Sequence, residues 1–174
     1  TDHAGGSQTI STLTALPHTV PEGVPDVLRD FGAFHADARA EIRRLSRGLD
    51  TAVRYDTAYF PDGDYADDDV HIERVVGDGD RVRLGPYDCE AVWTPGHSAH
   101  HVALWHADSG TLFSVDLVSR NGHFMYGPLH ADIGAYRDSL RRIRELDPDR
   151  LVPGHGPPMD DALARIDDAL EKSE

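Results

Sequence analysis

Residues 87–97 read YDCEAVWTPGH, an extended run that ends at a proline and a glycine and then presents a histidine. The run predicts a β-strand from Tyr87 to Trp93, because aromatic and β-branched residues favour extended structure. Pro95 and Gly96 favour a sharp exit from that strand. We therefore expect His97 to lie on a loop at a strand end, where a side chain can be directed towards a shared site.

Three other stretches place histidine or aspartate beside glycine, proline or a short apolar run. They read TDHAGG at residues 1–6, FSVD at residues 113–116 and PGHG at residues 153–156. Imidazole and carboxylate groups from separate strand ends are donors that a divalent metal ion requires. The pattern predicts that five side chains converge around a common metal centre: Asp2, His3, His97, Asp116 and His155.

Hydrophobic spacing predicts the other elements. Apolar residues at helical intervals indicate one or two helices over residues 24–47, with Gly32 weakening a single helix. Further strands are expected over residues 70–76, 81–84, 102–105 and 111–115, and a hairpin turn over 107–110. A helix over residues 133–146, a strand over 150–152 and a final helix from Met159 complete the order. This order is typical of helices that cover a sheet.

Size and charge limit the class of protein and its partners. The 174 residues include 31 acidic and 17 basic side chains, for a net charge of -14, and Lys172 is the only lysine. Such a chain repels phosphate backbones, so nucleic acid is not an expected partner. The excess of Asp over Lys resembles the acidic surfaces of proteins from extreme halophiles. We interpret this acidity, including the Asp-rich residues 62–69, as a solvation feature.

The chain has the length of one domain, and we expect a single domain over residues 1–174. It contains no run of about 18 apolar residues, so neither a transmembrane helix nor a membrane partner is expected. Cys89 is the only cysteine and cannot form an internal disulfide, which favours the cytoplasm as the compartment. The oligomeric state is not predicted by these features.

The ordered set of residues 1–6, 94–97, Asp116 and 153–156 resembles the metallo-β-lactamase-fold hydrolases, in particular their glyoxalase II and lactonase branch. The phrase from residue 75 to 97, with its Gly-Asp-rich turn, is similar to this family as well. The resemblance implies an α+β fold, the four-layer αββα sandwich of the metallo-β-lactamase type. The family's first motif is His-x-His-x-Asp-His, and residues 1–3 match its last three positions. The chain is thus expected to be N-terminally incomplete, without the two earlier histidines and the opening strands.

The resemblance distributes the ligands over two metal sites. It implies one site built from the two absent histidines and His97, a second from Asp2, His3 and His155, and Asp116 as the bridge between them. Two divalent ions are expected, with zinc as the first expectation, while iron or manganese also suits mixed nitrogen and oxygen donors. Asp2 is the expected catalytic residue, because it binds metal and accepts a hydrogen bond from the nucleophile.

The implied reaction is hydrolysis. The ions lower the pKa of a bound water to about 7, so that a metal-bound hydroxide exists at neutral pH. That hydroxide attacks the carbonyl of a small ester, thioester or lactone, and the ions stabilise the developing oxyanion. A small molecule is therefore the expected partner.

Other residues near the ligands have different expected roles. His123, Tyr126 and His130 lie in the loop that borders the active site in this family, so they are candidates for substrate contact. His100 and His101 follow His97 closely, and hydrogen bonding behind the ligands or packing is expected of them rather than ligation. Val115 stands where the family usually has glycine. A β-branched residue resists positive φ, so Val115 is expected to shift the Asp116 carboxylate slightly.

Three alternatives remain open. A mononuclear iron enzyme, resembling the persulfide dioxygenases of this superfamily, would use an upstream histidine, His97 and Asp116, with His155 spare. A nuclease of the same fold is disfavoured by the acidic charge. A non-catalytic domain is expected if the first two histidines of the motif are absent from the native protein. Metal content separates the two enzymes, since two zinc ions indicate hydrolysis and one iron with oxygen uptake indicates the dioxygenase.

Overall fold

The computed structural model describes residues 7–45, 70–120 and 131–174 of the chain. The chain divides into two units, residues 1–75 and 76–174, and each is described by itself. The expectation of a single domain over residues 1–174 stays a prediction. Among the described residues, no helix combines the length and the apolar character needed to cross a membrane.

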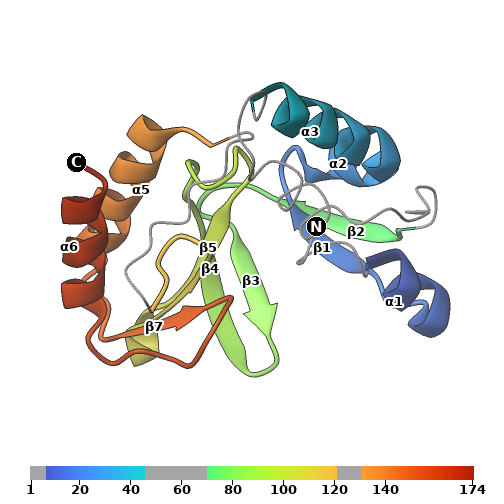
Figure 1. The fold of residues 1–174 in the computed structure, drawn as a ribbon. Helices are drawn as coiled ribbons and strands as arrows, with labels where there is room; N and C mark the ends of the chain where they lie inside the picture. Colours follow the sequence, from blue (N-terminus) through green and yellow to red (C-terminus); the bar gives the residue numbers. More distant parts are fainter. Residues whose placement is uncertain (1–6, 46–69, 121–130) are drawn as a thin grey trace. The chain divides into compact units, whose positions relative to one another are not determined.

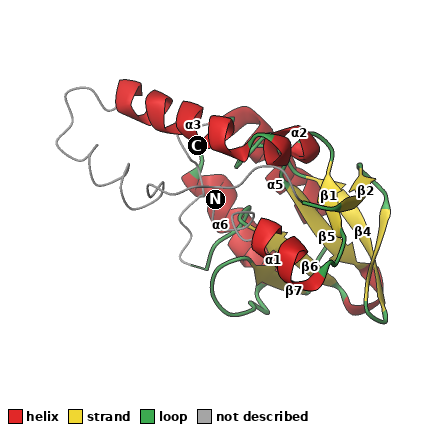
Figure 2. Ribbon diagram, turned by 90° about the vertical axis from the view of Figure 1, so that its right-hand side faces the viewer, coloured by secondary structure: helices red, strands yellow, loops and turns green. Residues whose placement is uncertain are grey.

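The first unit combines a two-stranded sheet with α-helices. Its elements are α1 (Ser7–Thr14), β1 (His18–Pro21), α2 (Val24–Arg29), α3 (Phe31–Leu45) and β2 (Ile72–Val76), whose last residue is the first of the second unit. Strands β1 and β2 pair with each other, and Figure 2 shows α2 beside them. The side chains of Val20, Leu28 and Phe31 form the core of this unit.

The helical pattern over residues 24–47 corresponds to two helices, and the break lies at Asp30. The backbone leaves the helical region there, and the Asp30 carboxylate accepts a hydrogen bond from the N–H of Ala33 at 3.0 Å. A carboxylate at this position satisfies a free N–H at the start of the next helix. The sequence patterns do not predict α1 or β1, because elements of eight and four residues give little periodicity.

The second unit is a five-stranded sheet with two helices. The strands are β3 (Arg81–Leu84), β4 (Tyr87–Trp93), β5 (Val102–His106), β6 (Thr111–Val115) and β7 (Arg150–Pro153). The 3-10 helix η1 (Ala107–Ser109) joins β5 to β6, and the α-helices are α5 (Ile133–Glu145) and α6 (Ala162–Lys172). The strand order is β3-β4-β5-β6-β7, antiparallel except for the parallel pair β6–β7. Helix α5 lies on the crossover that a parallel pair requires.

Helices α5 and α6 lie side by side and pack against the sheet (Figure 1). Their contact surface brings together Val92, Ala103 and Leu112 from adjacent strands with Ile143 and Ile166 from the helices. Each of these five residues is at most 1% exposed. Complete burial of one large aliphatic side chain contributes about 1.5–3 kcal/mol. This core therefore holds β4, β6 and β7 in place, and the candidate ligands follow the ends of these strands.

The predicted start of the final helix was wrong. Apolar spacing places Met159 in that helix, whereas α6 begins at Ala162. Met159 instead forms an isolated antiparallel bridge with Leu151 of β7, with two N–H···O hydrogen bonds of 2.9 Å. It is 4% exposed and belongs to the core. Hydrophobic spacing alone does not separate a buried bridge residue from the first turn of a helix.

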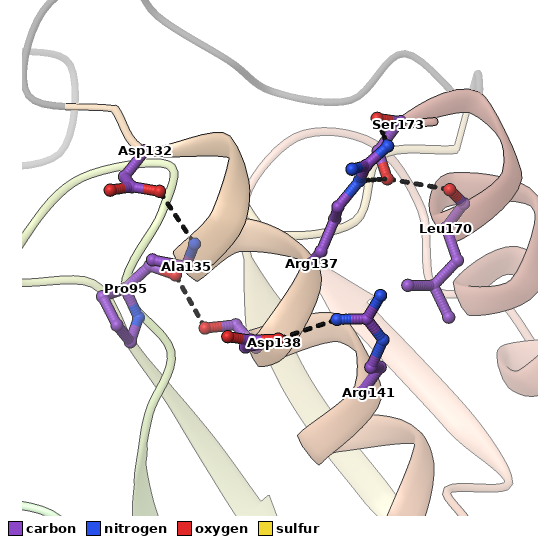
Figure 3. Close-up of polar contacts among 9 residues, drawn as sticks. Pro95, Asp132, Ala135, Arg137, Asp138, Arg141, Leu170 and Ser173 are labelled. Carbon is purple, nitrogen blue, oxygen red and sulfur yellow. Dashed lines mark hydrogen bonds and ion pairs between the residues drawn. The ribbon is translucent and has the colours of Figure 1, made fainter.

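Polar contacts join α5 to α6 and to the loop after β4 (Figure 3). Asp132 caps α5, since its carboxylate accepts a hydrogen bond from the N–H of Ala135 at 2.9 Å. Arg137 donates to the hydroxyl of Ser173 at 3.2 Å and also to the carbonyl oxygen of Ser173, at the end of α6. The hydroxyl of Ser139 donates to the carbonyl oxygen of Pro95 at 2.7 Å. The last contact attaches α5 to the loop that contains His97.

Asp78 and Arg142 connect the turn before β3 to helix α5 and to the end of β4. Arg142 donates to Asp78 Oδ2 at 2.8 Å and to the carbonyl oxygen of Trp93 at 2.9 Å. The N–H of Trp93 donates to Asp78 Oδ1 at 2.7 Å. The hydrogen bond from Arg142, supported by the one from Trp93, holds the pKa of the Asp78 carboxyl below its usual range.

We expect Asp78→Asn to lower the free energy of unfolding by about 1 kcal/mol at neutral pH, because the ion pair is partly exposed and screened. A carboxylate with a lowered folded-state pKa contributes stability above its unfolded pKa of about 4 and loses it as the pH falls through the folded value. The difference between wild type and variant should therefore shrink on acidification, which urea unfolding across this range measures. Asp138→Asn, which breaks an exposed pair with Arg141, is the control and should cost less than about 0.5 kcal/mol. If the stability difference between wild type and Asp78→Asn stays the same in acid, the pKa of Asp78 is not lowered in the folded protein.

Candidate metal centre

His97 lies on a closed loop between β4 and β5. The N–H of Thr94 donates to the carbonyl oxygen of His101 at 3.0 Å, which closes the base of the loop. Inside the loop, the N–H of Gly96 donates to the carbonyl oxygen of Ser98 at 3.1 Å. The His97 side chain is 24% exposed. The predicted placement of His97 on a loop directly after a strand is confirmed.

The loop lies directly against the start of helix α5. Gly96 has a φ of 131°, and a Cβ atom at this position would lie 2.3 Å from the Cα atom of Tyr136. The N–H of Asp132 donates to the carbonyl oxygen of Gly96 at 2.9 Å. Only glycine combines this backbone conformation with such a close approach. Gly96 therefore does more than help to end a strand, because it allows the loop to lie directly against the helix.

Asp116 lies in a tight turn directly after β6. The N–H of Leu117 donates to the carbonyl oxygen of Ser114 at 3.0 Å, and Val115 between them has a positive φ of 47°. The hydroxyl of Tyr136 on α5 donates to the carbonyl oxygen of Leu117 at 2.6 Å in a buried position. The Asp116 side chain is only 7% exposed. The turn is thus stabilised by a hydrogen bond within it and by a second one from helix α5.

His155 follows β7, next to the Asp116 turn. The N–H of Gly154 donates to the carbonyl oxygen of Val115 at 2.8 Å, which joins the two loops. The His155 side chain is 56% exposed. Asp116 and His155 line a small pocket together with Val115, Ser119 and Pro153.

The two carboxylate oxygens of Asp116 face two different imidazoles. His97 Nε2 lies 3.5 Å from Oδ2, and His155 Nε2 lies 3.6 Å from Oδ1. These separations are long for hydrogen bonds, which prefer about 2.9 Å between nitrogen and oxygen. They suit two donors of one tetrahedral ion, since metal–donor distances near 2.1 Å place the donor atoms about 3.4 Å apart. The donors therefore fit a carboxylate shared between two ions, one beside each histidine.

The structure brings together three of the five predicted ligands, His97, Asp116 and His155. Asp2 and His3 lie outside the described residues, and so do the predicted substrate contacts His123, Tyr126 and His130. Within residues 7–45, 70–120 and 131–174, no group of three or more His, Cys, Asp or Glu side chains is arranged so that it could hold a metal ion by itself. The described part thus contains a histidine and one oxygen of Asp116 for each of the two expected ions.

We expected His100 and His101 to form hydrogen bonds or to pack behind the ligands, and the structure shows one of these contacts for each. His101 is 7% exposed, and its ring contacts Thr94 Oγ1 at 2.8 Å and the N–H of Asp116 at 3.3 Å. The ring of His100 instead lies edge-on to that of Trp93, with 6.4 Å between centroids. The support from Tyr136 has no signal in the sequence, where this residue belongs only to the apolar face of a helix.

Val115 adopts the left-handed conformation that its side chain disfavours. Val115→Gly should relieve this strain and raise the free energy of unfolding. The expected net gain is about 1 kcal/mol, once the opposing cost of a more flexible unfolded chain is subtracted. Thermal or urea unfolding measures the change. Val115→Ala removes the β-branch but keeps the Cβ atom, so it should fall between the other two proteins. A Gly variant that is less stable than the Ala variant would show that the turn is not strained at this residue.

A family model described as the Metallo-beta-lactamase superfamily matches residues 1–155, which include all five predicted ligands. The chain belongs to the metallo-β-lactamase superfamily. Solved metallo-β-lactamase-fold proteins are similar to it in structure. ST1585 from Sulfolobus tokodaii has a TM-score of 0.64 at 20% identity, with coverage of 94% of this chain and 60% of that one. The predicted α+β class and metallo-β-lactamase fold are confirmed.

Two curated relatives and one further solved structure are similar to this chain over part of their length. A beta-lactamase-like protein 2 homolog from Caenorhabditis elegans is 35% identical over 60% of this chain and 35% of its own length. A hydroxyacylglutathione hydrolase from Rhodospirillum rubrum is 39% identical over 47% of this chain and 31% of its own length. TTHA1623, solved in a di-iron-bound form, is 28% identical with a TM-score of 0.64, covering 95% of this chain and 70% of that one. The matched part of the chain thus spans about a third of the curated relatives.

Proposed function

We propose that the protein is a metal-dependent hydrolase that acts on a small ester, thioester or lactone. The observation that supports this most directly is the position of the Asp116 carboxylate, with one oxygen towards His97 and the other towards His155. Membership of a superfamily of metallo-hydrolases supports the reaction class, and the similarity to a hydroxyacylglutathione hydrolase supports the branch.

The residues of this chain would hold two divalent ions through a shared carboxylate. His97 and His155 direct Nε2 towards Asp116, and we propose Asp2 and His3 as further ligands. When bound, such ions supply Lewis acidity and lower the pKa of a water molecule to about 7. The carboxylate of Asp116, which is 7% exposed, would compensate the charge of such ions at a position with little solvent, where electrostatic attraction is strong.

The remaining assignments are proposals of the same kind. Asp2 is proposed as the catalytic residue that orients the nucleophile, and His123, Tyr126 and His130 as substrate contacts. Zinc is the first expectation for the metal, and the di-iron form of TTHA1623 supports iron as the next. We also propose a small-molecule substrate, a cytoplasmic location and no membrane partner. The net charge of -14 supports only the further proposal that nucleic acid is not a partner.

The geometry argues against the mononuclear iron alternative. That enzyme would use His97 and Asp116 and leave His155 spare. In the structure, His155 Nε2 lies 3.6 Å from one Asp116 oxygen, and His97 Nε2 lies 3.5 Å from the other. Two nearly equal separations favour a symmetric role for the two histidines.

The test is metal content combined with turnover of the complete protein. We expect two metal ions per chain by elemental analysis, and metal-dependent hydrolysis of at least one compound in a panel of small thioesters, esters and lactones. Chelation should abolish this activity, and zinc should restore it. One iron per chain with oxygen uptake on a persulfide would establish the alternative, and a protein that binds no divalent metal would overturn both enzymes.

A further inference from the structure

Thr94, His101 and Asp116 form a continuous line of hydrogen bonds behind the candidate metal centre. Thr94 Oγ1 lies 2.8 Å from Nδ1 of His101, and Nε2 of the same ring lies 3.3 Å from the backbone nitrogen of Asp116. Thr94 is fully buried and His101 is 7% exposed. Water therefore competes little for these contacts, and an unmatched donor or acceptor here would be costly.

The contact with the backbone decides which nitrogen of His101 bears the proton. The N–H of Asp116 can only donate, so Nε2 is the acceptor and has no proton. In a neutral imidazole the other nitrogen then bears the proton, and Nδ1 donates to Thr94 Oγ1. The Thr94 hydroxyl in turn donates towards the carbonyl oxygen of Val92 at 3.4 Å. One tautomer satisfies every contact in the line.

This line couples the two loops that contain His97 and Asp116. The carbonyl oxygen of His101 closes the first loop by accepting from Thr94 at 3.0 Å, while its ring holds the backbone of the second. The rings of His97 and His101 also meet edge to face, with centroids 5.9 Å apart. A displacement of His101 is thus transmitted to both ligands that face the first ion.

We propose that His101 is a positioning residue which, as the neutral Nδ1–H tautomer, fixes the backbone of Asp116 relative to the loop of His97. Both ring nitrogens are engaged in this line, so His101 acts through Asp116 rather than as a ligand itself. Its role for the metal rests on the proposed function, whereas the tautomer and the hydrogen bond can be measured without any metal. Partners that orient metal ligands typically contribute about 10–100-fold to metal affinity.

The first experiment is NMR on the complete, metal-free protein. Long-range proton–nitrogen correlations of His101 should show a protonated Nδ1 and an unprotonated Nε2. Hydrogen exchange should show a protected amide at Asp116. An Nε2–H tautomer or an imidazolium at neutral pH overturns the proposal, and so does an Asp116 amide that exchanges like an exposed one. This experiment can overturn the positioning role even if the protein binds no metal, whereas a lack of metal binding would overturn only the proposed function.

The second experiment compares variants that keep or remove each hydrogen bond. His101→Gln retains an acceptor for the N–H of Asp116, and His101→Leu does not. We expect about 10–100-fold weaker zinc binding by His101→Leu, with substantial recovery in His101→Gln. Equal losses in Gln and Leu variants would show that only packing matters and would overturn the proposal. His100→Gln, at the neighbouring position, is the control and should bind zinc like the wild type.

Thr94 provides a test that leaves the histidine in place. Thr94→Val removes the hydroxyl with little change in volume, and Thr94→Ser keeps it. We expect Thr94→Val to speed exchange of the Asp116 amide and to lower the population of the Nδ1–H tautomer, while Thr94→Ser resembles the wild type. If Thr94→Val folds and retains the same tautomer and the same Asp116 protection, the line of hydrogen bonds does not act as a unit.

Discussion

Gly96→Ala is expected to lower the free energy of unfolding by more than about 3 kcal/mol and to displace His97. The added Cβ atom would lie 2.3 Å from the backbone nitrogen and the Cα atom of Tyr136. These are backbone atoms of α5 and cannot rotate away as the end of a side chain could. The φ of 131° adds strain, because residues with a side chain rarely adopt it. Urea unfolding and zinc titration measure the two effects.

Gly79→Ala provides the matched control for this substitution. Gly79 also has a positive φ, of 80°, but an added Cβ atom would meet nothing within 4 Å. The same change in the unfolded chain applies to both variants, so it cancels in the comparison. We expect Gly79→Ala to lower the free energy of unfolding by about 1 kcal/mol because of the backbone conformation alone, and to bind zinc like the wild type. Equal penalties at the two glycines would contradict the close contact with Tyr136.

Asp116→Ala is expected to weaken the binding of both metal ions by more than about 100-fold, because a shared direct ligand should matter more than the residues that orient it. One oxygen of this carboxylate faces His97 and the other faces His155. Its removal would therefore take one donor from each of the two proposed ions and would also remove the negative charge between them. Metal content after dialysis and competition with a chromogenic chelator measure the loss.

Single histidine variants distinguish a shared carboxylate from two unrelated sites. His97→Ala and His155→Ala should each retain one ion with high affinity and lose the other. His106→Ala is the control, since the described contacts of His106 are with Ser109 and Tyr87 and not with a proposed ligand, and this variant should retain both ions. If Asp116→Ala keeps one ion at full affinity, the carboxylate belongs to a single site and the two-ion proposal is wrong.

Local patterns predicted most of the second unit. Strands β3 to β7 and helix α5 agree closely with the expected ranges, because alternation and helical spacing reflect which side chains face the core. The wrong start of the final helix at Met159 has the same origin. The spacing correctly indicated that Met159 is buried, but it did not show that a bridge to Leu151, and not a helix, buries it. The short elements α1 and β1 lie where the sequence shows little periodicity.

The candidate ligands and their order along the chain were proposed from the sequence, and their identity as ligands stays a prediction. A histidine after Pro-Gly and an aspartate after an apolar strand are local signals, and the family resemblance connected them. The positive φ of Val115 agrees with the glycine that the family usually has at this position. The contributions of Tyr136 and Ser139 were not readable, because their hydroxyls reach loops that are distant in sequence.

The amino-acid sequence by itself determined the strands, their approximate ends and the histidine and aspartate side chains that follow them, since all of these depend on neighbouring residues along the chain. Only the tertiary structure decided that the oxygens of Asp116 divide between His97 and His155, and that the two ring nitrogens of His101 contact Thr94 and the backbone nitrogen of Asp116. Those features depend on contacts between segments separated by many residues. Directional hydrogen bonds and close packing set them, and no local pattern of residues encodes either.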